Sequence, residues 1–267
     1  MITKNNLQCN DCNLVFNEHY FDSKGTPKYD HKNRESVYNY AKKLEGKTLR
    51  DVCGEVIISD GIKKTAKGKF GSDLEKFYFG YENNFDHSPD FSELGVEVKS
   101  TGVIPDSKPD IRGYFQAKER ISLAVVDFPN IEAQSFEESL WRKIKDPLFV
   151  LYDYTSAKND FDKKIILVDF YEYSQYEKEM IISEWKIIKD VVLNHGGQEV
   201  SQGKLGHRYL EPTTTGANSK VRVKNRDGLS PCKPRRFAFP NQKTQPYGQA
   251  NRIVKKLLNY NIDFIES

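Results

Sequence analysis

One segment of this chain alternates polar and apolar side chains, Leu94-Gly95-Val96-Glu97-Val98-Lys99. A period of two predicts a β-strand, in which neighbouring side chains point to opposite faces. Val96 and Val98 would then face a core, while Glu97 and Lys99 would share the other face. The segment therefore predicts a strand with one packed face and one face available for chemistry.

Two further carboxylates precede this strand. Asp90 lies seven residues before Glu97, and Glu75 lies on the flank of a predicted helix that faces the Asp90 segment. Mg²⁺ prefers oxygen ligands and keeps several waters, so carboxylates on neighbouring elements suit it. One or two such ions held against a phosphodiester lower the pKa of a water and stabilise the attacking and leaving oxygens. We therefore predict that Glu75, Asp90 and Glu97 bind Mg²⁺, with Mn²⁺ able to substitute.

Lys99 is predicted to lie beside the attacking water. A lysine that is partly desolvated and close to cations has its pKa pushed down, so Lys99 could orient or deprotonate that water. The sequence leaves both roles open. It also leaves a simpler alternative open, because 30% of the residues are charged and a half-exposed edge strand could show the same pattern.

Composition indicates a folded protein. The 267 residues are 37% hydrophobic and 12% aromatic, which is enough for a substantial core. No apolar run approaches the roughly 20 residues that cross a bilayer, and the first residues are polar. We therefore expect a cytoplasmic protein without a membrane partner.

The cysteines are few and scattered: Cys9, Cys12, Cys53 and Cys232. This distribution does not suit a disulfide framework, so reduced thiols are expected. The first two, together with His19 and His31, could form a small zinc site, although the second ligand pair lacks the usual tight spacing. The alternative is a loosely packed N-terminal arm.

Positive charge is concentrated near the C-terminus. Residues 203–256 carry 13 Lys or Arg against two acidic residues, a net charge of +11 in a chain whose total is +3. Such clusters typically contact a phosphate backbone. The alternation in Lys220-Val221-Arg222-Val223-Lys224 predicts a strand that lines up cations on one side, although a solvated basic loop is the alternative.

Helical and extended segments follow one another in an order typical of a mixed α/β (α+β) protein. Helices are predicted at residues 33–45, 72–79, 179–194 and 249–260, and strands at 94–99, 114–117, 120–126, 148–152 and 164–170. Residues 1–30 are interpreted as an N-terminal extension, 31–175 as a core with a mixed sheet flanked by helices, and 176–267 as a smaller C-terminal part on the same fold. On the predicted helix 179–194, a buried stripe is expected of Ile182, Trp185, Ile188 and Val192, and on 249–260 we expect Lys255 and Lys256 to point outward.

Several blocks in this order resemble the MutH mismatch-repair nickase and the MutH-like type II restriction endonucleases that cut GATC. The resemblance covers roughly residues 33–255. Its blocks are Lys67–Gly71 with Leu74-Glu75, Asp90-Phe91 with Leu94–Lys99, Lys118–Leu123, Arg142–Lys145, Tyr209–Lys220 and Arg235–Phe239.

The resemblance implies a restriction-endonuclease-like core and a C-terminal DNA-recognition subdomain. It implies catalytic roles for Lys67, Glu75, Asp90, Glu97, Lys99 and, in the third block, Lys143. It implies DNA binding by Thr213, Thr214, Thr215, Gly216, Asn218, Lys220, Arg222, Arg235 and Arg236. The three threonines stand where the nickase has a basic pair. Base contacts there are therefore expected to be made by hydroxyl groups or to be directed at different base atoms.

The resemblance implies two competing activities, and a third possibility comes from another class of protein. The first is a restriction enzyme that cuts double-stranded DNA at GATC or a related site, leaves 5′-phosphate and 3′-hydroxyl ends, forms a homodimer on DNA and is paired with a cognate DNA methyltransferase. The second is a nickase activated by a partner protein. The third is a non-catalytic DNA-binding or allosteric module, which the predicted active-site residues disfavour. The blocks at 118–123 and 209–217 resemble the restriction branch more closely, so we favour the first.

Overall fold

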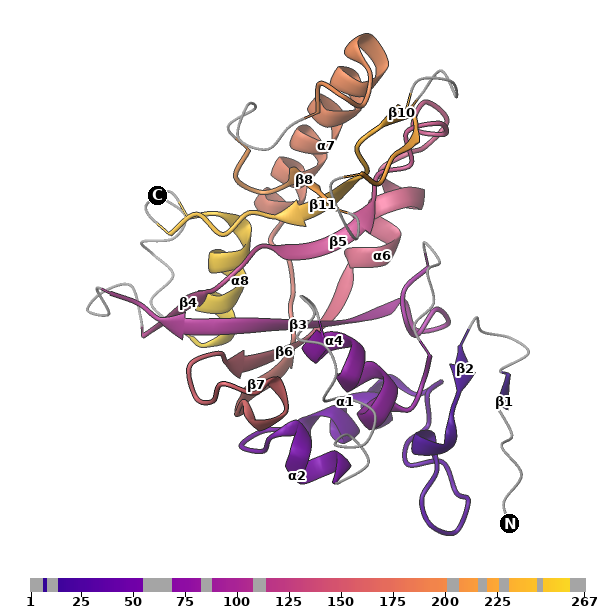
Figure 1. Cartoon of the computed structure of the whole chain (residues 1–267), viewed down its shortest axis with the longest axis vertical. Helices are drawn as coiled ribbons and strands as arrows, with labels where there is room; N and C mark the ends of the chain where they lie inside the picture. Colours follow the sequence, from indigo (N-terminus) through magenta and orange to yellow (C-terminus); the bar gives the residue numbers. More distant parts are fainter. Residues whose placement is uncertain are drawn as a thin grey trace. The chain divides into compact units, whose positions relative to one another are not determined.

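In the computed structural model, the structure describes residues 7–8, 14–54, 69–82, 88–107, 114–200, 207–215, 220–225, 231–243 and 247–259. The chain forms two compact units (Figure 1). The first contains Met1–Pro105 and Asp146–Tyr171, and the second contains Asp106–Lys145 and Glu172–Ser267. The chain therefore leaves the first unit after β3 and returns to it at β6, while the functional boundaries expected at residues 30 and 175 stay predictions.

A mixed sheet organises the first unit. Strand β3 (Val96–Pro105) pairs in parallel with β6 (Asp146–Asp153), and β6 pairs antiparallel with β7 (Ile165–Phe170). Val96 and Val98 are 0% and 3% exposed. The predicted strands at 94–99, 148–152 and 164–170 and the packed valine face are thus confirmed.

Short helices pack beside these strands. Helix α1 (Arg34–Lys42) contacts β7, and α4 (Lys69–Asp73) contacts β3 (Figure 1). The Asn33 side chain caps α1 by accepting a hydrogen bond from the Ser36 N–H at 3.0 Å. The remaining helical segments of this unit are α2 (Leu49–Cys53), the 3₁₀ turns η1 (Glu18–Tyr20) and η4 (Asp160–Asp162), and the π-helical turn η2 (Leu74–Phe79), which continues α4.

The N-terminal segment contributes to the core of this unit. Strand β2 (Val15–Phe16) pairs with β1 (Leu7–Gln8), and Leu14 and Tyr29 are 1% and 4% exposed. The Tyr29 hydroxyl donates to the Phe79 carbonyl at 2.9 Å. The end of the predicted N-terminal extension, at Tyr29, thus contacts the last residue of η2.

An antiparallel sheet organises the second unit, with the order β5 (Ile121–Val125), β11 (Arg235–Phe239), β8 (Glu211–Thr214). A small hairpin joins β9 (Val223–Lys224) to β10 (Pro231–Cys232). The strand predicted from Lys220 is therefore shorter than expected. Strand β4 (Phe115–Ala117) also belongs to this unit.

The main helix of the second unit is α7 (Gln175–His195), which Ser174 and Glu177 begin with a capping box. Gly196 ends it with φ +82°, as the sequence predicted. On its face Ile181 and Glu184 are buried in addition to the predicted Trp185, Ile188 and Val192, whereas Ile182 is only half-buried. The other helical segments are η3 (Glu137–Trp141), α6 (Arg142–Ile144) and α8 (Gln249–Leu257).

One expectation for α8 is wrong. Lys255 is 1% exposed, and its ammonium lies 3.4 Å from both Asp106 Oδ2 and the Phe115 carbonyl. A buried cation is tolerated there because a carboxylate and a carbonyl compensate it. The helical period alone had placed it outward.

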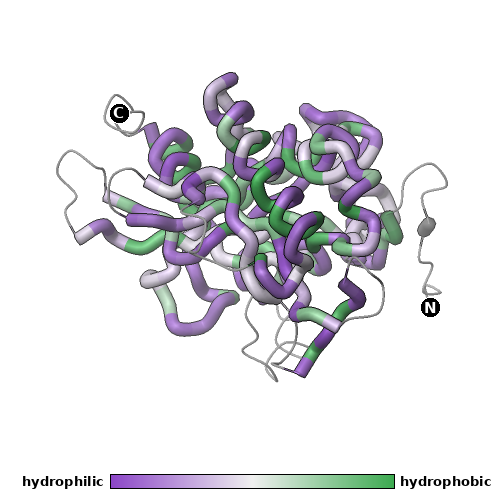
Figure 2. The backbone as a smooth tube through the Cα atoms, turned by 90° about the horizontal axis from the view of Figure 1, so that it is seen from above, coloured by the Kyte–Doolittle hydropathy of each residue, from purple (hydrophilic) through white to green (hydrophobic). Residues whose placement is uncertain are grey.

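Hydrophobic residues alternate with hydrophilic ones along the chain (Figure 2). This pattern suits elements that each bury one face. Among the described residues, we find no helix with the length and apolar character needed to cross a membrane.

Candidate active site

A tight turn brings Asp90 beside Glu97 despite the six residues between them. Phe91 and Val96 exchange two backbone hydrogen bonds, of 2.9 and 3.2 Å. Gly95 lies within this turn at φ +72°, a conformation that favours glycine. The turn therefore returns the chain so that Asp90 lies next to the start of β3.

Hydrogen bonds fix the two carboxylates against each other. The Val98 N–H donates to Asp90 Oδ2 at 2.9 Å, and the Asp90 N–H donates to Glu97 Oε2 at 3.1 Å. The Lys99 ammonium donates to Glu97 Oε1. Asp90 and Glu97 are 9% and 2% exposed. We call Asp90, Glu97 and Lys99 the active-site cluster.

Electrostatics make Asp90 hard to ionise. Burial raises the pKa of Asp90 well above its ordinary value, and the negative charges of Glu97 and Glu75 raise it further. Lys99 and the Val98 N–H lower this pKa but do not cancel the effect. Negative charge is thus in excess here, and a bound cation would relieve it.

Lys99 keeps its proton in the protein alone. Burial lowers the pKa of Lys99, but the charges of Glu97 and Asp90 and the hydrogen bond to Glu97 outweigh it, so the net pKa is raised. The lowered pKa predicted for a lysine beside metal ions therefore does not hold without them. In this arrangement Lys99 is a donor.

Glu75 approaches the active-site cluster from η2. It is half-buried, and its charge raises the pKa of both Asp90 and Lys99. Within the part of the chain that the structure describes, no three His, Cys, Asp or Glu side chains are grouped so as to hold a metal ion. The donor set of two adjacent buried carboxylates still fits Mg²⁺, because that ion keeps several waters and binds through one or two carboxylates plus substrate phosphate.

Gly80 ends the turn that carries Glu75. Its φ is +75°, and a Cβ placed on it would lie 2.2 Å from the Tyr20 backbone nitrogen. Only glycine fits this close approach. The N-terminal segment therefore helps to position Glu75.

The structure does not test the other catalytic candidates. Lys143 lies on α6 in the second unit. Lys67 lies outside the described residues, as do Gly216 and Asn218 of the predicted recognition loop. Their roles stay predictions.

Two strands carry the remaining DNA-binding candidates. Arg235 lies opposite Thr214, and Arg236 lies opposite Thr213. Opposed residues share a face of an antiparallel sheet and consecutive ones do not, so the two arginines occupy opposite faces. We call β8 and β11 the recognition strands. Lys220 and Arg222 lie between these two strands in the sequence, and both are exposed. The Thr215 N–H donates to the Pro234 carbonyl at 3.1 Å.

Arg235 is buried and Arg236 is half-buried, and neither pairs with a carboxylate among the described residues. Arg235 is 8% exposed, its Nη1 donates to the Thr214 hydroxyl, and its Nε has no partner. The Arg236 Nε is also buried without a partner. Burial lowers the pKa of both groups. Within the described residues, neither guanidinium has a counter-charge.

A buried glutamate that the sequence did not single out holds the start of β8. Glu184 on α7 accepts hydrogen bonds from the N–H groups of Arg208, Tyr209 and Leu210 at 2.5–2.9 Å. His207 Nδ1 donates to the Leu210 carbonyl at 2.7 Å, so His207 makes a structural contact with the backbone just before β8. A glutamate within a helix gives no sequence signal for such a contact.

The histidines of the zinc hypothesis pack in the first unit. The His19 ring lies 5.3 Å from that of Phe77, and His31 Nδ1 lies 2.9 Å from the Tyr20 hydroxyl. Cys9 and Cys12 fall outside the described residues. His19 and His31 therefore have aromatic neighbours, and the zinc hypothesis gains no support from them.

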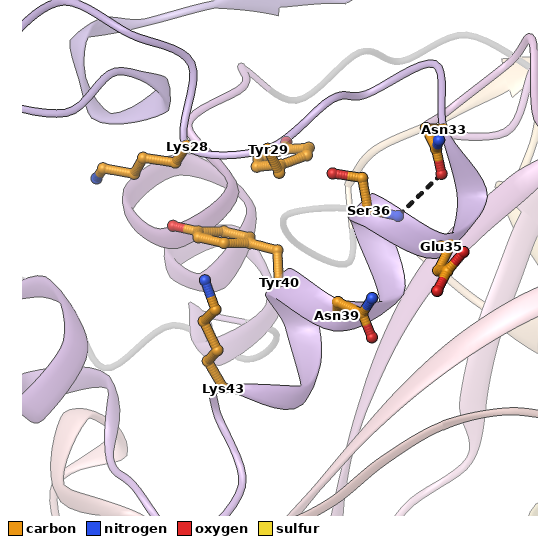
Figure 3. A pocket seen from close by; sticks show the side chains of 8 residues that line it. All are labelled: Lys28, Tyr29, Asn33, Glu35, Ser36, Asn39, Tyr40 and Lys43. Carbon is orange, nitrogen blue, oxygen red and sulfur yellow. Dashed lines mark hydrogen bonds between the residues drawn. The ribbon is translucent and has the colours of Figure 1, made fainter.

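A pocket in the first unit contains none of the predicted site residues (Figure 3). Lys43 reaches toward the Tyr40 ring, with its Nζ 5.5 Å from the ring centroid, while Glu35 and Asn39 precede Tyr40 on α1. The complete lining is Lys28, Tyr29, Asn33, Glu35, Ser36, Asn39, Tyr40 and Lys43.

Comparison with known proteins finds similarity to a DNA-repair family and to a restriction enzyme. The model of the family "DNA mismatch repair enzyme MutH" matches residues 79–184, a range that includes the active-site cluster. The type II restriction enzyme Sau3AI of Staphylococcus aureus is 28% identical over 190 residues, which cover 70% of this chain and 36% of that enzyme. The chain thus corresponds to about a third of the length of this relative. In sequence, the chain is thus similar to the MutH family over residues 79–184 and to a type II restriction enzyme over most of its length.

Proposed function

We propose that this protein is a Mg²⁺-dependent, sequence-specific DNA endonuclease of type II, which leaves 5′-phosphate and 3′-hydroxyl ends. One observation carries the proposal: Asp90, Glu97 and Lys99 lie together, largely buried and hydrogen-bonded, within the segment that matches the MutH model. The restriction enzyme among its relatives supports the type II assignment.

Each residue of the active-site cluster has a distinct task. Asp90 and Glu97 would hold the cation, which, when bound, supplies charge neutralisation and a lower pKa of water at the phosphodiester. Val98 orients Asp90 through its N–H. Lys99 is a protonated donor in the protein alone, which favours orientation of the attacking water over its deprotonation. Glu75 adds negative charge at the edge of the cluster.

The second unit supplies reasons to expect a polyanion. Residues 203–256 have a net charge of +11. Arg235 is buried and Arg236 is half-buried, neither has a carboxylate partner among the described residues, and an uncompensated buried charge is costly. Phosphate groups of DNA would supply the missing counter-charge, while Thr213–Thr215 would present hydroxyl groups to base edges.

Incubation of the purified chain with plasmid and Mg²⁺ tests the proposal. We expect discrete fragments whose sequenced ends share one short site, GATC or a related sequence. Intact DNA with folded protein in both Mg²⁺ and Mn²⁺ would refute the proposal. DNA methylated at the site should resist cutting if a cognate methyltransferase is the functional partner.

Lys99→Met separates catalysis from binding. We expect cleavage to fall by at least about 100-fold, the lower range for loss of a positioned proton-transfer or charge-stabilising group. Gel retardation in Ca²⁺ should stay within about twofold of the wild type, since phosphate contacts dominate affinity. The control is Lys42→Met, which breaks the 2.6 Å pair with Glu45 in the same unit and should leave cleavage intact. Equal losses in both variants would contradict the role of Lys99.

A nicking activity is the second candidate, because the matched family is described as a mismatch-repair enzyme. In that case the chain alone would nick slowly, and a partner protein would accelerate it. Retardation of DNA without any cleavage would instead support a non-catalytic binding module.

A further inference from the structure

Tyr81 is a buried group that the mechanism does not use. Its side chain is 1% exposed, and its hydroxyl has no hydrogen-bond partner among the described residues. A buried hydroxyl without a partner costs free energy, so such groups call for an explanation. Other buried tyrosines in this core, such as Tyr78 and Tyr29, donate to backbone carbonyls at 2.7 and 2.9 Å.

The ring of Tyr81 is held next to the active-site cluster. It packs against Phe91, with centroids 5.7 Å apart and planes at 82°, and Phe91 follows Asp90 in the tight turn. The Tyr81 N–H donates to the Glu75 carbonyl at 3.2 Å. The Tyr81 ring thus contacts the residue after Asp90, and the Tyr81 backbone is bonded to Glu75, so both contacts involve the segments that carry predicted metal ligands.

The charges that act on the Tyr81 hydroxyl come mainly from Asp90 and Glu75. Burial raises the pKa of Tyr81 well above its ordinary value, and the next causes are the charges of Asp90 and Glu75. The phenol therefore stays protonated and can donate at any physiological pH. Asp90 accepts from Val98 through Oδ2, while its Oδ1 has no hydrogen-bond donor among the described residues.

We propose that Tyr81 is a positioning residue for the metal site, whose hydroxyl donates to Asp90 Oδ1, directly or through one water, when a divalent cation draws that carboxylate into place. This inference rests on the proposed function. Without a cation, the Tyr81 hydroxyl has no partner among the described residues. With a cation bound, it would gain Asp90 Oδ1 as an acceptor. Tyr81 thus contributes to cation affinity and not to the stability of the metal-free fold.

Tyr81→Phe tests this, because it removes the hydroxyl and keeps the ring. We expect the melting temperature without metal to stay unchanged or rise, since an unpaired polar group is lost. We expect the Kd for Mn²⁺, measured by isothermal titration calorimetry on the full chain, to rise about tenfold, as for one lost hydrogen bond of about 1.4 kcal/mol.

The matched control is Tyr78→Phe. Its hydroxyl lies in the same core but donates to the Tyr40 carbonyl, and its electrostatic neighbours are Tyr40 and Cys53. This variant should melt at a lower temperature and bind Mn²⁺ as the wild type does.

Three outcomes would overturn the inference. If Tyr81→Phe lowers the melting temperature as Tyr78→Phe does and leaves the Kd for Mn²⁺ unchanged, the role of Tyr81 is structural. If neither quantity changes, the hydroxyl has no role. If the wild type itself binds no Mn²⁺, the proposed metal site fails, and the inference fails with it; in the first two outcomes the proposed function stands.

Discussion

Asp90 is kept in an environment that opposes its charge. It is 9% exposed and lies beside Glu97, and burial is the first cause of its raised pKa. The Lys99 ammonium donates its hydrogen bond to Glu97 and therefore does not satisfy both carboxylates. Such strain is common where a site is built for a ligand and not for its own stability.

The raised pKa of Asp90 sets the sign of a pH effect. Between the ordinary carboxyl pKa of about 4 and the raised value, the folded protein binds more protons than the unfolded chain. The free energy of unfolding from this group therefore falls as pH rises through that window. Divalent cations compete with that proton, so their stabilising effect should grow with pH.

Asp90→Asn should remove this effect. Without metal at pH 8, we expect the melting temperature to rise by a few degrees, since about 1 kcal/mol corresponds to roughly 2–4 °C at this size. The difference in melting temperature between pH 5 and pH 8 should shrink, and added Mg²⁺ should no longer stabilise. Scanning calorimetry in EDTA and in Mg²⁺ measures all three.

The control for this variant is Glu93→Gln, on the same hairpin. Glu93 is exposed and pairs with Lys32 at 3.1 Å, so its loss should not raise the melting temperature. A lower melting temperature for Asp90→Asn at every pH would mean that the hydrogen bond from Val98 outweighs the charge repulsion.

At the scale of elements, the pairing of the recognition strands determines which of the two arginines shares a face with an exposed threonine. Arg235 shares a face with Thr214, which is exposed, whereas Arg236 shares the other face with the half-buried Thr213. A duplex that lies against one face of a sheet contacts alternate residues. The two adjacent arginines therefore cannot both contact DNA on the same face.

We expect Arg235 to be the DNA-contacting residue of the pair. Arg235→Gln should weaken DNA binding and reduce the slope of log affinity against log salt by about one phosphate contact, roughly 0.9. Fluorescence anisotropy across a salt series measures both quantities. Lys233→Gln is the matched control, because it removes one exposed positive charge two residues away. Equal effects in the two variants would show that only net charge matters.

The sequence predicted elements whose pattern reflects burial. The valines of β3 and the helices at 33–45 and 179–194 follow local patterns of burial, so β3, α1 and α7 lie within a few residues of their predicted positions. The proximity of Asp90 to Glu97 could also be predicted, because a short hairpin is the simplest connection between two residues seven positions apart.

Other features depend on contacts between distant parts of the chain. Lys255 is buried because Asp106, 149 residues away, compensates it, and Glu184 is buried because it accepts three N–H groups from 208–210. From the sequence, Tyr81 resembles any core aromatic residue; in the structure, its ring packs against Phe91 and its hydroxyl has no partner among the described residues. No periodicity encodes such contacts, since each is specific to the fold.

At the scale of the whole molecule, the number of catalytic centres limits how DNA can be cut. Within the residues that the structure describes, the chain carries one active-site cluster. One cluster hydrolyses one strand at a time, so double-strand cleavage requires two chains on a symmetric site or two successive nicks.

Mixing experiments distinguish these routes. If two chains act together, replacing half of the wild-type protein by Lys99→Met at constant total protein leaves about a quarter of the complexes with two active chains, by random pairing of a two-fold dimer. We expect linear plasmid to form at about that fraction of the original rate while nicked circles accumulate, because mixed dimers cut one strand. Diluting the wild type twofold with buffer is the control. If the doped mixture yields linear product as fast as the diluted wild type, without extra nicked circles, successive nicks by single chains are the route and the dimer is excluded.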